Sequence, residues 1–410
     1  MNEDRFDMTW EKVKIKSIWK GFYDGPHATP PVCENGGIFL GISNITPNGH
    51  IDLSDIKYIS EEDLPKWTKR VVPQEGDIVF SYEATLNLYA IIPEGFHGCL
   101  GRRMALIRVD EKKASNRFLF YYFFSKEWRT TVAENTIVGS TVDRIPIAKF
   151  PEFPITLPPL IVQQKIASIL SAYDNLIENN NKRIKILEQM AENLYKEWFV
   201  RFRFPGHETT PIENGIPKGW DEKRLSDLID VDPLLPIKKG IQVKSIPMEA
   251  LSTDSMIVDE NCIQLVDNPS GSHSQNGDTL VARITPCLEN GKTGFVQCLD
   301  DGETATGSTE FIVLRSKELS PYYVYCFARS LYFRQTAILS MNGADGRQRV
   351  NIPKIKSMKL ANPSNEIVKK FDSIVKPIFE EIYLLTKQNK NNSKQRDLLL
   401  PRLMNGKLAV

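Results

Sequence analysis

The feature that most constrains the fold of this chain is a series of mostly apolar residues in its middle, spaced alternately four and three apart. Such a spacing averages 3.5 residues, which keeps one seam of a helix turned toward a partner helix. Pro158-Pro159 precedes the series and Pro205-Gly206 follows it, so both ends are marked by residues that interrupt helices. At 1.5 Å per residue the helix would be about 50 Å long. The seam consists of Ile166, Leu170, Tyr173, Ile177, Asn180, Ile184, Leu187, Ala191, Leu194 and Trp198.

An internal repeat organises the rest of the chain. The interval between matching residues changes along the sequence, which indicates loop insertions. Two copies of a globular domain followed by a helix therefore account for the whole chain. The matches are Trp10 with Trp220, Gly76-Asp77 with Gly277-Asp278, residues 105–108 with 312–315, Gly139 and Pro146 with Gly346 and Pro353 (207 residues later), and Lys165 with Lys370 (205 residues later).

The second copy of the helix has a seam of its own, found by moving the first seam 205 residues along the chain. Its ends are apolar, but its part from Asn389 to Arg396 is polar, and we expect this part to be frayed or solvated. Pro377 lies inside the pattern and should kink the helix or interrupt its hydrogen bonds. Because a globular domain separates the helices, an antiparallel pair is the easier one to form. The second seam consists of Phe371, Val375, Ile378, Ile382, Leu385, Asn389, Asn392, Arg396, Leu399 and Leu403.

These patterns predict an α+β fold, in which two mixed α/β domains are joined by two long antiparallel coiled-coil helices as a pseudo-two-fold internal repeat. A chain of 410 residues is long enough for more than one core. Short apolar runs between Gly, Pro and Asn predict strands, and the aromatic-rich segment 117–128 predicts a buried helix. The expected parts are the first domain (1–157), the central helix (158–204), a linker rich in Pro, Gly and Thr (205–219), the second domain (220–360) and the C-terminal helix (361–410).

No apolar run is long enough to cross a membrane, and the N-terminus is acidic and polar, so we expect a cytoplasmic protein. The six cysteines are scattered without a CxxC pair, and the five histidines are dispersed, which argues against a metal site. The net charge of +1 gives no support to nucleic-acid binding by bulk charge, so any basic surface must be local.

Catalytic motifs are scarce in the sequence. Gly291-Lys292-Thr293 has the end of a phosphate-binding loop, but Pro286 occupies the place of its first glycine, and a turn between strands is the better interpretation. Residues 362–365 begin like the Asn-Pro motif of amino-methyltransferases but lack its second proline and its aromatic residue, so we expect a helix start capped by Ser364 or Asn365. A binding protein is therefore favoured over an enzyme.

Local basic and polar residues in glycine-bracketed loops are the candidates for contacts to DNA. Such side chains suit both phosphate contacts and the reading of base edges. Surface arginines on turns are common, and each alone is more often solvated than functional, but here they occur at corresponding places in two copies. Lys14 and Lys16 are expected to share one face of a strand. The candidates are Lys14, Lys16, Tyr82, Arg102, Arg103, Ser140, Thr141, Arg144, Arg283, Ser308, Arg347, Gln348 and Arg349.

Several motifs give the chain a family resemblance. They are Pro158-Pro159-Leu160, the helix start at 163–170, the Asn-rich segment 177–181, the helix end at 194–200, residues 398–408, and the strand openings at 76–81 and 277–283. In these motifs the chain resembles the specificity subunits of type I restriction-modification systems, over nearly its whole length.

This resemblance implies a non-catalytic subunit with two target-recognition domains, each reading one half of a split, asymmetric sequence in double-stranded DNA. The helical pair would set the distance between the domains and hold two methyltransferase subunits, which restriction-translocase subunits join for cleavage. The chain would have no cofactor of its own, because S-adenosylmethionine, ATP and Mg would belong to the partners. The helix residues expected to hold this assembly are Ile166, Leu170, Tyr173, Ile177, Leu187, Leu194, Phe371, Ile378, Ile382 and Leu399.

The residues leave alternatives open. The partner could be a fused restriction-methylation enzyme rather than separate subunits. The coiled coil could instead belong to a scaffold that does not bind DNA, in which case the loop arginines would be dispensable. An independent methyltransferase or nuclease is a third possibility, which methyl transfer by the isolated chain would support.

Overall fold

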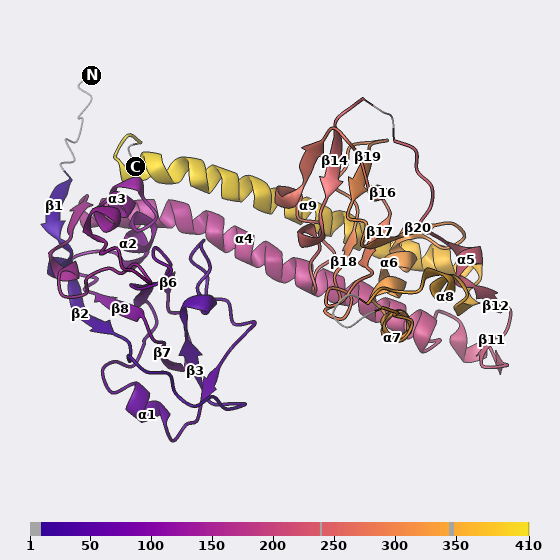
Figure 1. Ribbon diagram of the computed structural model, residues 1–410, viewed down its shortest axis with the longest axis horizontal. Coiled ribbons are helices and arrows are strands. Elements are labelled where there is room, and N and C mark those ends of the chain that lie inside the picture. The colour runs from indigo at the N-terminus through magenta and orange to yellow at the C-terminus, as the bar shows by residue number, and fades with distance from the viewer. Residues whose placement is uncertain (1–9, 238–239, 344–347, 409) are drawn as a thin grey trace. The chain divides into compact units, whose positions relative to one another are not determined.

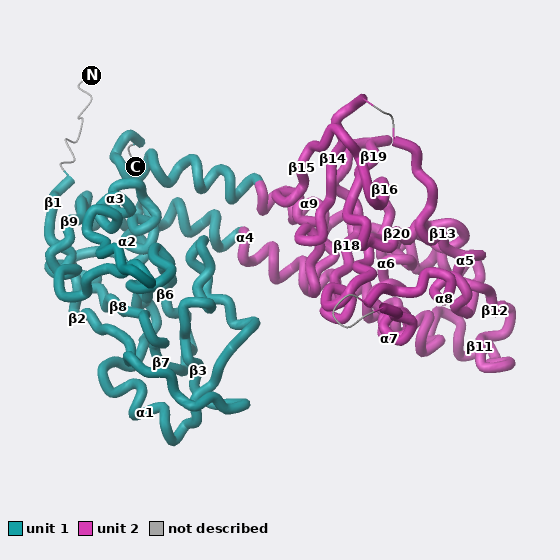
Figure 2. Tube along the Cα trace, in the orientation of Figure 1, with its two compact units in different colours: residues 1–176, 391–410 teal, residues 177–390 magenta. Residues whose placement is uncertain are grey.

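A computed structural model describes residues 10–237, 240–343, 348–408 and 410. The chain divides into two compact units, Met1–Leu176 with Asn391–Val410, and Ile177–Lys390 (Figure 2). The long helices α4 (Leu160–Tyr195) and α9 (Asn365–Met404) contribute residues to both units (Figure 1). Each unit therefore contains a globular part and a section of each long helix. The predicted combination of mixed α/β parts with two long helices is confirmed.

The first unit contains three small sheets. The largest has the strand order β2-β8-β5-β6 and is antiparallel, a second has the order β4-β3-β7, and β1 pairs with β9. Its strands are β1 (Glu11–Lys14), β2 (Trp19–Asp24), β3 (Gly37–Leu40), β4 (Tyr58–Ile59), β5 (Ile78–Ser81), β6 (Tyr89–Ile91), β7 (Gly98–Leu100), β8 (Met104–Val109) and β9 (Pro154–Leu157), and its short helices are η1 (Ile15–Ile18), η2 (Ile42–Asn44), α1 (Leu64–Trp67), α2 (Asn116–Tyr122), α3 (Lys126–Asn135) and η3 (Phe150–Glu152).

The second unit repeats these sheets. Its order β13-β20-β17-β18 corresponds to β2-β8-β5-β6, and its pair β12-β21 corresponds to β1-β9. Its order β15-β14-β19 corresponds to β4-β3-β7 with the same strand directions, and β16 is added beside β19. Its strands are β10 (Ile212–Glu213), β11 (Ile216–Pro217), β12 (Asp221–Arg224), β13 (Ile229–Val231), β14 (Val243–Ile246), β15 (Gln264–Val266), β16 (Ser272–Gln275), β17 (Thr279–Ala282), β18 (Thr293–Phe295), β19 (Thr304–Gly307), β20 (Phe311–Ser316) and β21 (Lys359–Asn362). Its short helices are η4 (Lys196–Val200), η5 (His207–Thr209), α5 (Leu225–Leu228), η6 (Met248–Ala250), η7 (Glu260–Cys262), α6 (Pro321–Arg329), α7 (Leu331–Leu339) and α8 (Ile352–Lys356).

The same buried ion pair forms in both units between residues that the sequence repeat matches. In the first unit Arg108 donates from Nε and Nη2 to the two carboxylate oxygens of Asp77, at 2.9 and 2.7 Å. Arg315 and Asp278 form the same pair in the second unit, at 2.8 and 2.7 Å. The two aspartate side chains are only 3% and 1% exposed. These repeated residues therefore stabilise each sheet and are not available to a ligand.

Sections of the long helices complete the core of each unit. Ile166 and Leu170 of α4 and Leu403 of α9 are buried in the aromatic core of the first unit. Tyr195 and Phe371 are buried in the core of the second unit. Every position of both predicted seams is buried or half-buried. The sections are thus parts of each globular core rather than separate rods attached to it.

The polar part of the second seam is not frayed, and the expectation for Asn389 to Arg396 was wrong. In the second unit Asn180 Nδ2 donates to Asn389 Oδ1 at 2.9 Å, and Asn389 Nδ2 donates to Asn181 Oδ1 at 2.8 Å. In the first unit Arg396 Nη1 donates to Asp174 Oδ1 at 2.6 Å, and the Arg396 side chain is 15% exposed. Asn180, Asn389 and Arg396 are each satisfied by a polar partner on the opposite helix, which is how buried polar groups become tolerable.

Other contacts in the second unit fix the direction of the helices. Arg183 of α4 pairs with Glu381, whereas Trp198, in η4 directly after α4, packs on Phe371, which comes earlier in α9. The pair is therefore antiparallel, as predicted. The helix α9 continues through Pro377, and the hydroxyl of Ser364 accepts from Ile367 N at 3.5 Å at its start.

Two local predictions need comment. The segment 117–128 does not form a single helix, because Ser125 accepts from Trp128 N and begins α3 after α2 has ended. The segment predicted as a linker holds the short hairpin of β10 and β11, and Phe204 stacks on Trp220 with ring centroids 5.2 Å apart. Among the described helices, none combines the length and the apolar character needed to cross a membrane.

Candidate nucleic-acid interface

In the second unit, three segments meet where β17 ends and β20 begins. Arg283 follows β17, its N–H donates to Glu310 O at 2.9 Å, and its carbonyl accepts from Val350 N at 2.9 Å. Arg349 and Asn342 exchange two backbone hydrogen bonds of 2.9 and 3.0 Å across the loop between them. We call Arg283, Glu310 and Arg349 the second cluster. Because the segments are tied together through the backbone, these side chains start from fixed positions.

A bidentate ion pair forms the centre of the second cluster. Arg349 donates from Nε to both carboxylate oxygens of Glu310, at 3.0 and 2.9 Å, and from Nη2 to Oε1 at 2.6 Å. The Arg349 side chain is 47% exposed and that of Glu310 is 23% exposed. The hydrogen bonds from Arg349 lower the pKa of Glu310, so its carboxylate is ionised near neutral pH. The pair combines a fixed geometry with access to solvent.

The first unit builds the same backbone frame. Tyr82 follows β5, its N–H donates to Arg103 O at 3.1 Å, and its carbonyl accepts from Ile145 N at 2.7 Å. Arg144 exchanges backbone hydrogen bonds with Ile137, at 2.9 and 3.1 Å. We call Tyr82, Glu83, Arg103 and Arg144 the first cluster.

These bonds correct the expected register of the loop. Arg144 and Arg349 occupy the same place in the two frames, 205 residues apart, and not the 207 that matching Gly139 and Pro146 to Gly346 and Pro353 gave. The structure does not describe residues 344–347, so the position of the predicted residue Arg347 lies outside it.

The side chains of the first cluster differ from those of the second. Arg103 Nε lies 3.0 Å from Glu83 Oε1, but the Nε is buried and makes no hydrogen bond of acceptable geometry among the described residues. Arg144 is exposed and has no ion pair within the described part of the chain. Tyr82 is only 6% exposed, and burial is the main cause that raises its pKa. It therefore lies beneath the cluster rather than on its surface.

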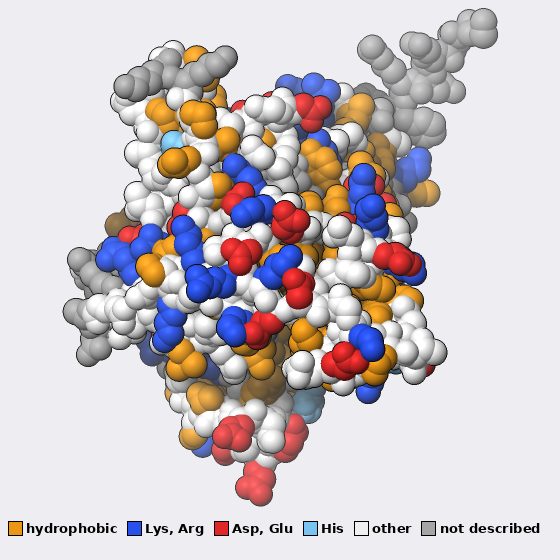
Figure 3. All heavy atoms as spheres, turned by 90° about the vertical axis from the view of Figure 1, so that its right-hand side faces the viewer, with side chains coloured by type: hydrophobic (Ala, Val, Ile, Leu, Met, Phe, Trp, Pro, Cys, Tyr) orange, Lys and Arg blue, Asp and Glu red, His pale blue; other side chains and the backbone are white. Residues whose placement is uncertain are grey.

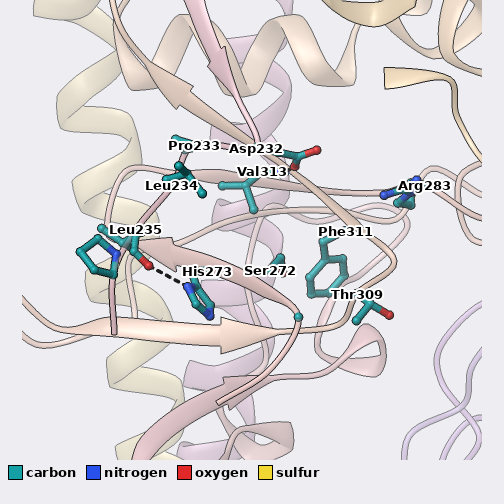
Figure 4. A pocket seen from close by; sticks show the side chains of 12 residues that line it. Asp232, Pro233, Leu234, Leu235, Ser272, His273, Arg283, Thr309, Phe311 and Val313 are labelled. Carbon is teal, nitrogen blue, oxygen red and sulfur yellow. Dashed lines mark hydrogen bonds between the residues drawn. The ribbon is translucent and has the colours of Figure 1, made fainter. Parts of the chain in front are cut away.

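A pocket of about 680 Å³ adjoins the second cluster (Figure 4). In Figure 4 the loop residues Pro233, Leu234 and Leu235 lie at one end and Arg283 and Thr309 at the other. Leu234 is completely exposed. His273 Nδ1 donates to Leu235 O at 2.7 Å and holds the loop to β16. The surface beside the cluster is thus partly apolar, which suits contact with the apolar parts of base edges.

The structure separates some predicted residues from the clusters. Lys14 is in β1, but Lys16 is in η1, so the expectation that both share a strand face was wrong. Both pair with Glu152, at 2.7 and 2.5 Å, and lower its pKa to about 2. The single carboxylate of Glu152 therefore offsets one of the two positive charges, and the group keeps a net charge of +1.

The remaining predicted residues lie on or near the clusters. Arg102 is exposed beside Arg103, and Ser140 and Thr141 are exposed in the loop that Ile137 and Arg144 close. Gln348 accepts from Thr285 N at 3.2 Å through its carbonyl, and Ser308 Oγ accepts from Glu310 N at 3.2 Å.

Sequence reasoning missed Glu310 and Leu234. The match of residues 105–108 with 312–315 places Glu310 opposite Arg103, so the repeat itself held the signal for the first. No comparable signal distinguished Leu234 from other apolar residues.

The face of the molecule in Figure 3 shows Lys and Arg side chains interspersed with Asp and Glu, in keeping with a net charge of +1. No group of three or more His, Cys, Asp or Glu side chains in the described ranges could hold a metal ion.

Known proteins resemble this chain along most of its length. The type I restriction modification DNA specificity domain matches residues 8–189. The chain is 27% identical to the type I restriction enzyme MjaIX specificity subunit of Methanocaldococcus jannaschii, over 97% of this chain and 89% of the relative. These comparisons support a type I restriction-modification specificity subunit. The chain is also 22% identical to the HindI specificity subunit of Haemophilus influenzae, over 90% of this chain and 94% of that one.

The fold agrees with that assignment. A crystal structure of the type I restriction-modification S subunit from M. genitalium superposes with a TM-score of 0.57, at 15% identity, over 98% of both chains. The relation is one of fold along nearly the whole chain, including the part beyond residue 189.

Proposed function

We propose that this specificity subunit binds double-stranded DNA and selects a bipartite, asymmetric target, one part with each cluster. The observation that carries the proposal is that one backbone frame occurs twice with different side chains on it. Arg103 occupies the place of Glu310, and Glu83 the place of Ile284. Two sites of one design but different chemistry would read two different sequences.

The proposal extends to partner subunits. The subunit would direct two methyltransferase subunits and the restriction-translocase subunits to the target, without catalysis or a cofactor of its own. S-adenosylmethionine, ATP and Mg would come with those partners, and the complex would act in the cytoplasm. Exposed apolar side chains on the long helices, Ile186 and Met190 on α4 and Leu384 and Leu398 on α9, support a partner surface there.

Methylation mapping of a complete complex tests this function. The subunit is expressed with its methyltransferase partner in a host without methylation of its own, and methylated positions are read across the genome. We expect one motif made of two specified parts separated by unspecified bases. The matched control omits the specificity subunit and should show no motif. A complex that assembles and methylates DNA without any gapped motif would contradict the proposal.

A further inference from the structure

We infer that Arg349 reads a guanine in the target part selected by the second cluster, and that Glu310 is the positioning residue that holds Arg349 in its reading conformation. The inference rests on the proposed DNA-recognition function. It assigns one kind of base to one side chain, which the function alone does not do.

The backbone of Arg349 is fixed on both sides. It is tied to Asn342 by two hydrogen bonds, while the neighbouring Gln348 and Val350 are bonded to Thr285 and Arg283. An arginine whose backbone is held in this way keeps its starting point when DNA arrives. Less conformational freedom remains to be lost on binding than for an arginine on a free loop.

The side chain is fixed as well. Glu310 occupies the Nε edge of the guanidinium and accepts from Nη2. The opposite edge carries Nη1 and the second hydrogen of Nη2, which these bonds do not use. Two parallel N–H groups on one edge match the N7 and O6 acceptors that guanine presents in the major groove. Since nearly half of the Arg349 side chain is exposed, that edge can be reached.

The charge of the pair favours a base over a phosphate. Glu310 is ionised and neutralises Arg349, so the pair gains little from a negatively charged phosphate and would repel it through the carboxylate. A guanine edge is an uncharged acceptor and meets no such repulsion. Arg144, at the same place in the first unit, has no bound carboxylate among the described residues and fits a phosphate better.

Substitutions in the complete methyltransferase complex test the inference through the methylation motif. Arg349→Ala should relax one G·C position in the part read by the second cluster, with discrimination there reduced by about 5- to 150-fold. Glu310→Gln keeps the shape but removes the charge, and should relax the same position to a smaller extent. Arg224→Ala, an exposed arginine on β12 outside the cluster, should leave every position unchanged.

Three outcomes would overturn the inference. The first is a motif with no G·C pair in the part assigned to the second cluster. The second is an Arg349→Ala complex that keeps every position but binds more weakly at all sequences, with a shallower salt dependence, which identifies a phosphate contact. The third is an unchanged motif in Glu310→Gln. If Arg349→Ala does not assemble, Glu310→Gln decides. A wild-type complex without a gapped motif would instead refute the proposed function.

Discussion

The first and second clusters share their backbone and differ in almost every side chain that matters. In the second, Glu310 binds Arg349 with good hydrogen-bond geometry. In the first, Arg103 replaces that glutamate and approaches Glu83 without a hydrogen bond of good geometry, while Arg144 is exposed. The same carboxylate–arginine chemistry is thus present in both units but connects different positions.

This difference teaches how one fold can hold two specificities. The residues that repeat, such as Asp77 with Arg108 and Asp278 with Arg315, are buried and stabilise the sheets. The charged cluster residues that do not repeat, Glu83, Arg103 and Glu310, are partly exposed. Recognition can therefore change without loss of the fold, because the frame does not depend on the side chains that meet the ligand.

The largest expected effect is on stability, and it tests whether the buried ion pairs contribute equally in the two units. Asp278→Ala leaves Arg315 without its partner and should cost about 3–5 kcal/mol of unfolding free energy. Asp77→Ala should cost a similar amount, because Arg108 makes the same bonds. Urea denaturation of the full chain measures both. The exposed Lys112→Ala, whose side chain has no ion pair among the described residues, is the control and should leave stability unchanged within error. A large loss in only one unit would break the comparison.

The next effect concerns the helix seams, where the first unit uses an ion pair and the second an amide pair. Arg396→Ala removes the partner of Asp174 in a largely buried position and should cost roughly 2 kcal/mol. Asn389→Leu replaces an amide by an apolar seam residue and should cost less, since heptad seams favour apolar residues. Thermal denaturation compares the two variants. A greater loss in Asn389→Leu would show that the amide pair is the stronger element.

A smaller effect is expected from exchanging cluster residues. Ile284→Glu with Glu310→Arg places the glutamate and the arginine of the first cluster at the corresponding positions of the second, while Arg283 and Arg349 stay unchanged. Specificity in the second target part should change, with about 1–3 kcal/mol lost at the affected base pair, while the first part keeps its sequence. Methylation mapping reads both parts in one experiment. Changes in both parts would show that the clusters do not act separately.

The smallest effect compares two glutamates by pH. Glu188 accepts from Ser255 Oγ and Met256 N, and burial raises its pKa. The contribution of Glu188 to stability is fully present below the pKa that it has in the unfolded chain. It is lost as the pH rises through the higher pKa that it has in the folded protein. Glu188→Gln keeps the acceptor oxygen and should raise stability at pH 7 but hardly at pH 4.

Glu152 has the opposite sign. Its pKa is lowered by Lys14 and Lys16, so its contribution is present above its unfolded pKa and is lost as pH falls toward about 2. Glu152→Gln should therefore lower stability slightly at pH 7. Denaturation across pH checks both variants, and equal signs would contradict the assignment.

The helices and the repeat could be predicted from the sequence because they rest on regular spacing. Heptad positions such as Ile166 and Phe371 and the Gly-Asp matches need no knowledge of distant contacts. The polar seam was misjudged because Arg396 is satisfied by Asp174, more than two hundred residues earlier. A local pattern does not reveal such a partner.

The candidate site was predictable only in part. Arg103, Arg144 and Arg349 were found because basic residues were sought, whereas Glu310 was missed because a carboxylate opposes the expected charge. The loop register differed by two residues because glycines were matched instead of the backbone pairs of Arg144 and Arg349.

Exchange of one globular part tests the central claim most directly. Residues 220–360 are replaced by the corresponding part of another specificity subunit, and the complete complex is mapped by its methylation. The account predicts a motif in which the part read by the second unit is new and the part read by the first unit is unchanged. A motif in which both parts change, or neither does, would contradict the assignment of one target part to each cluster.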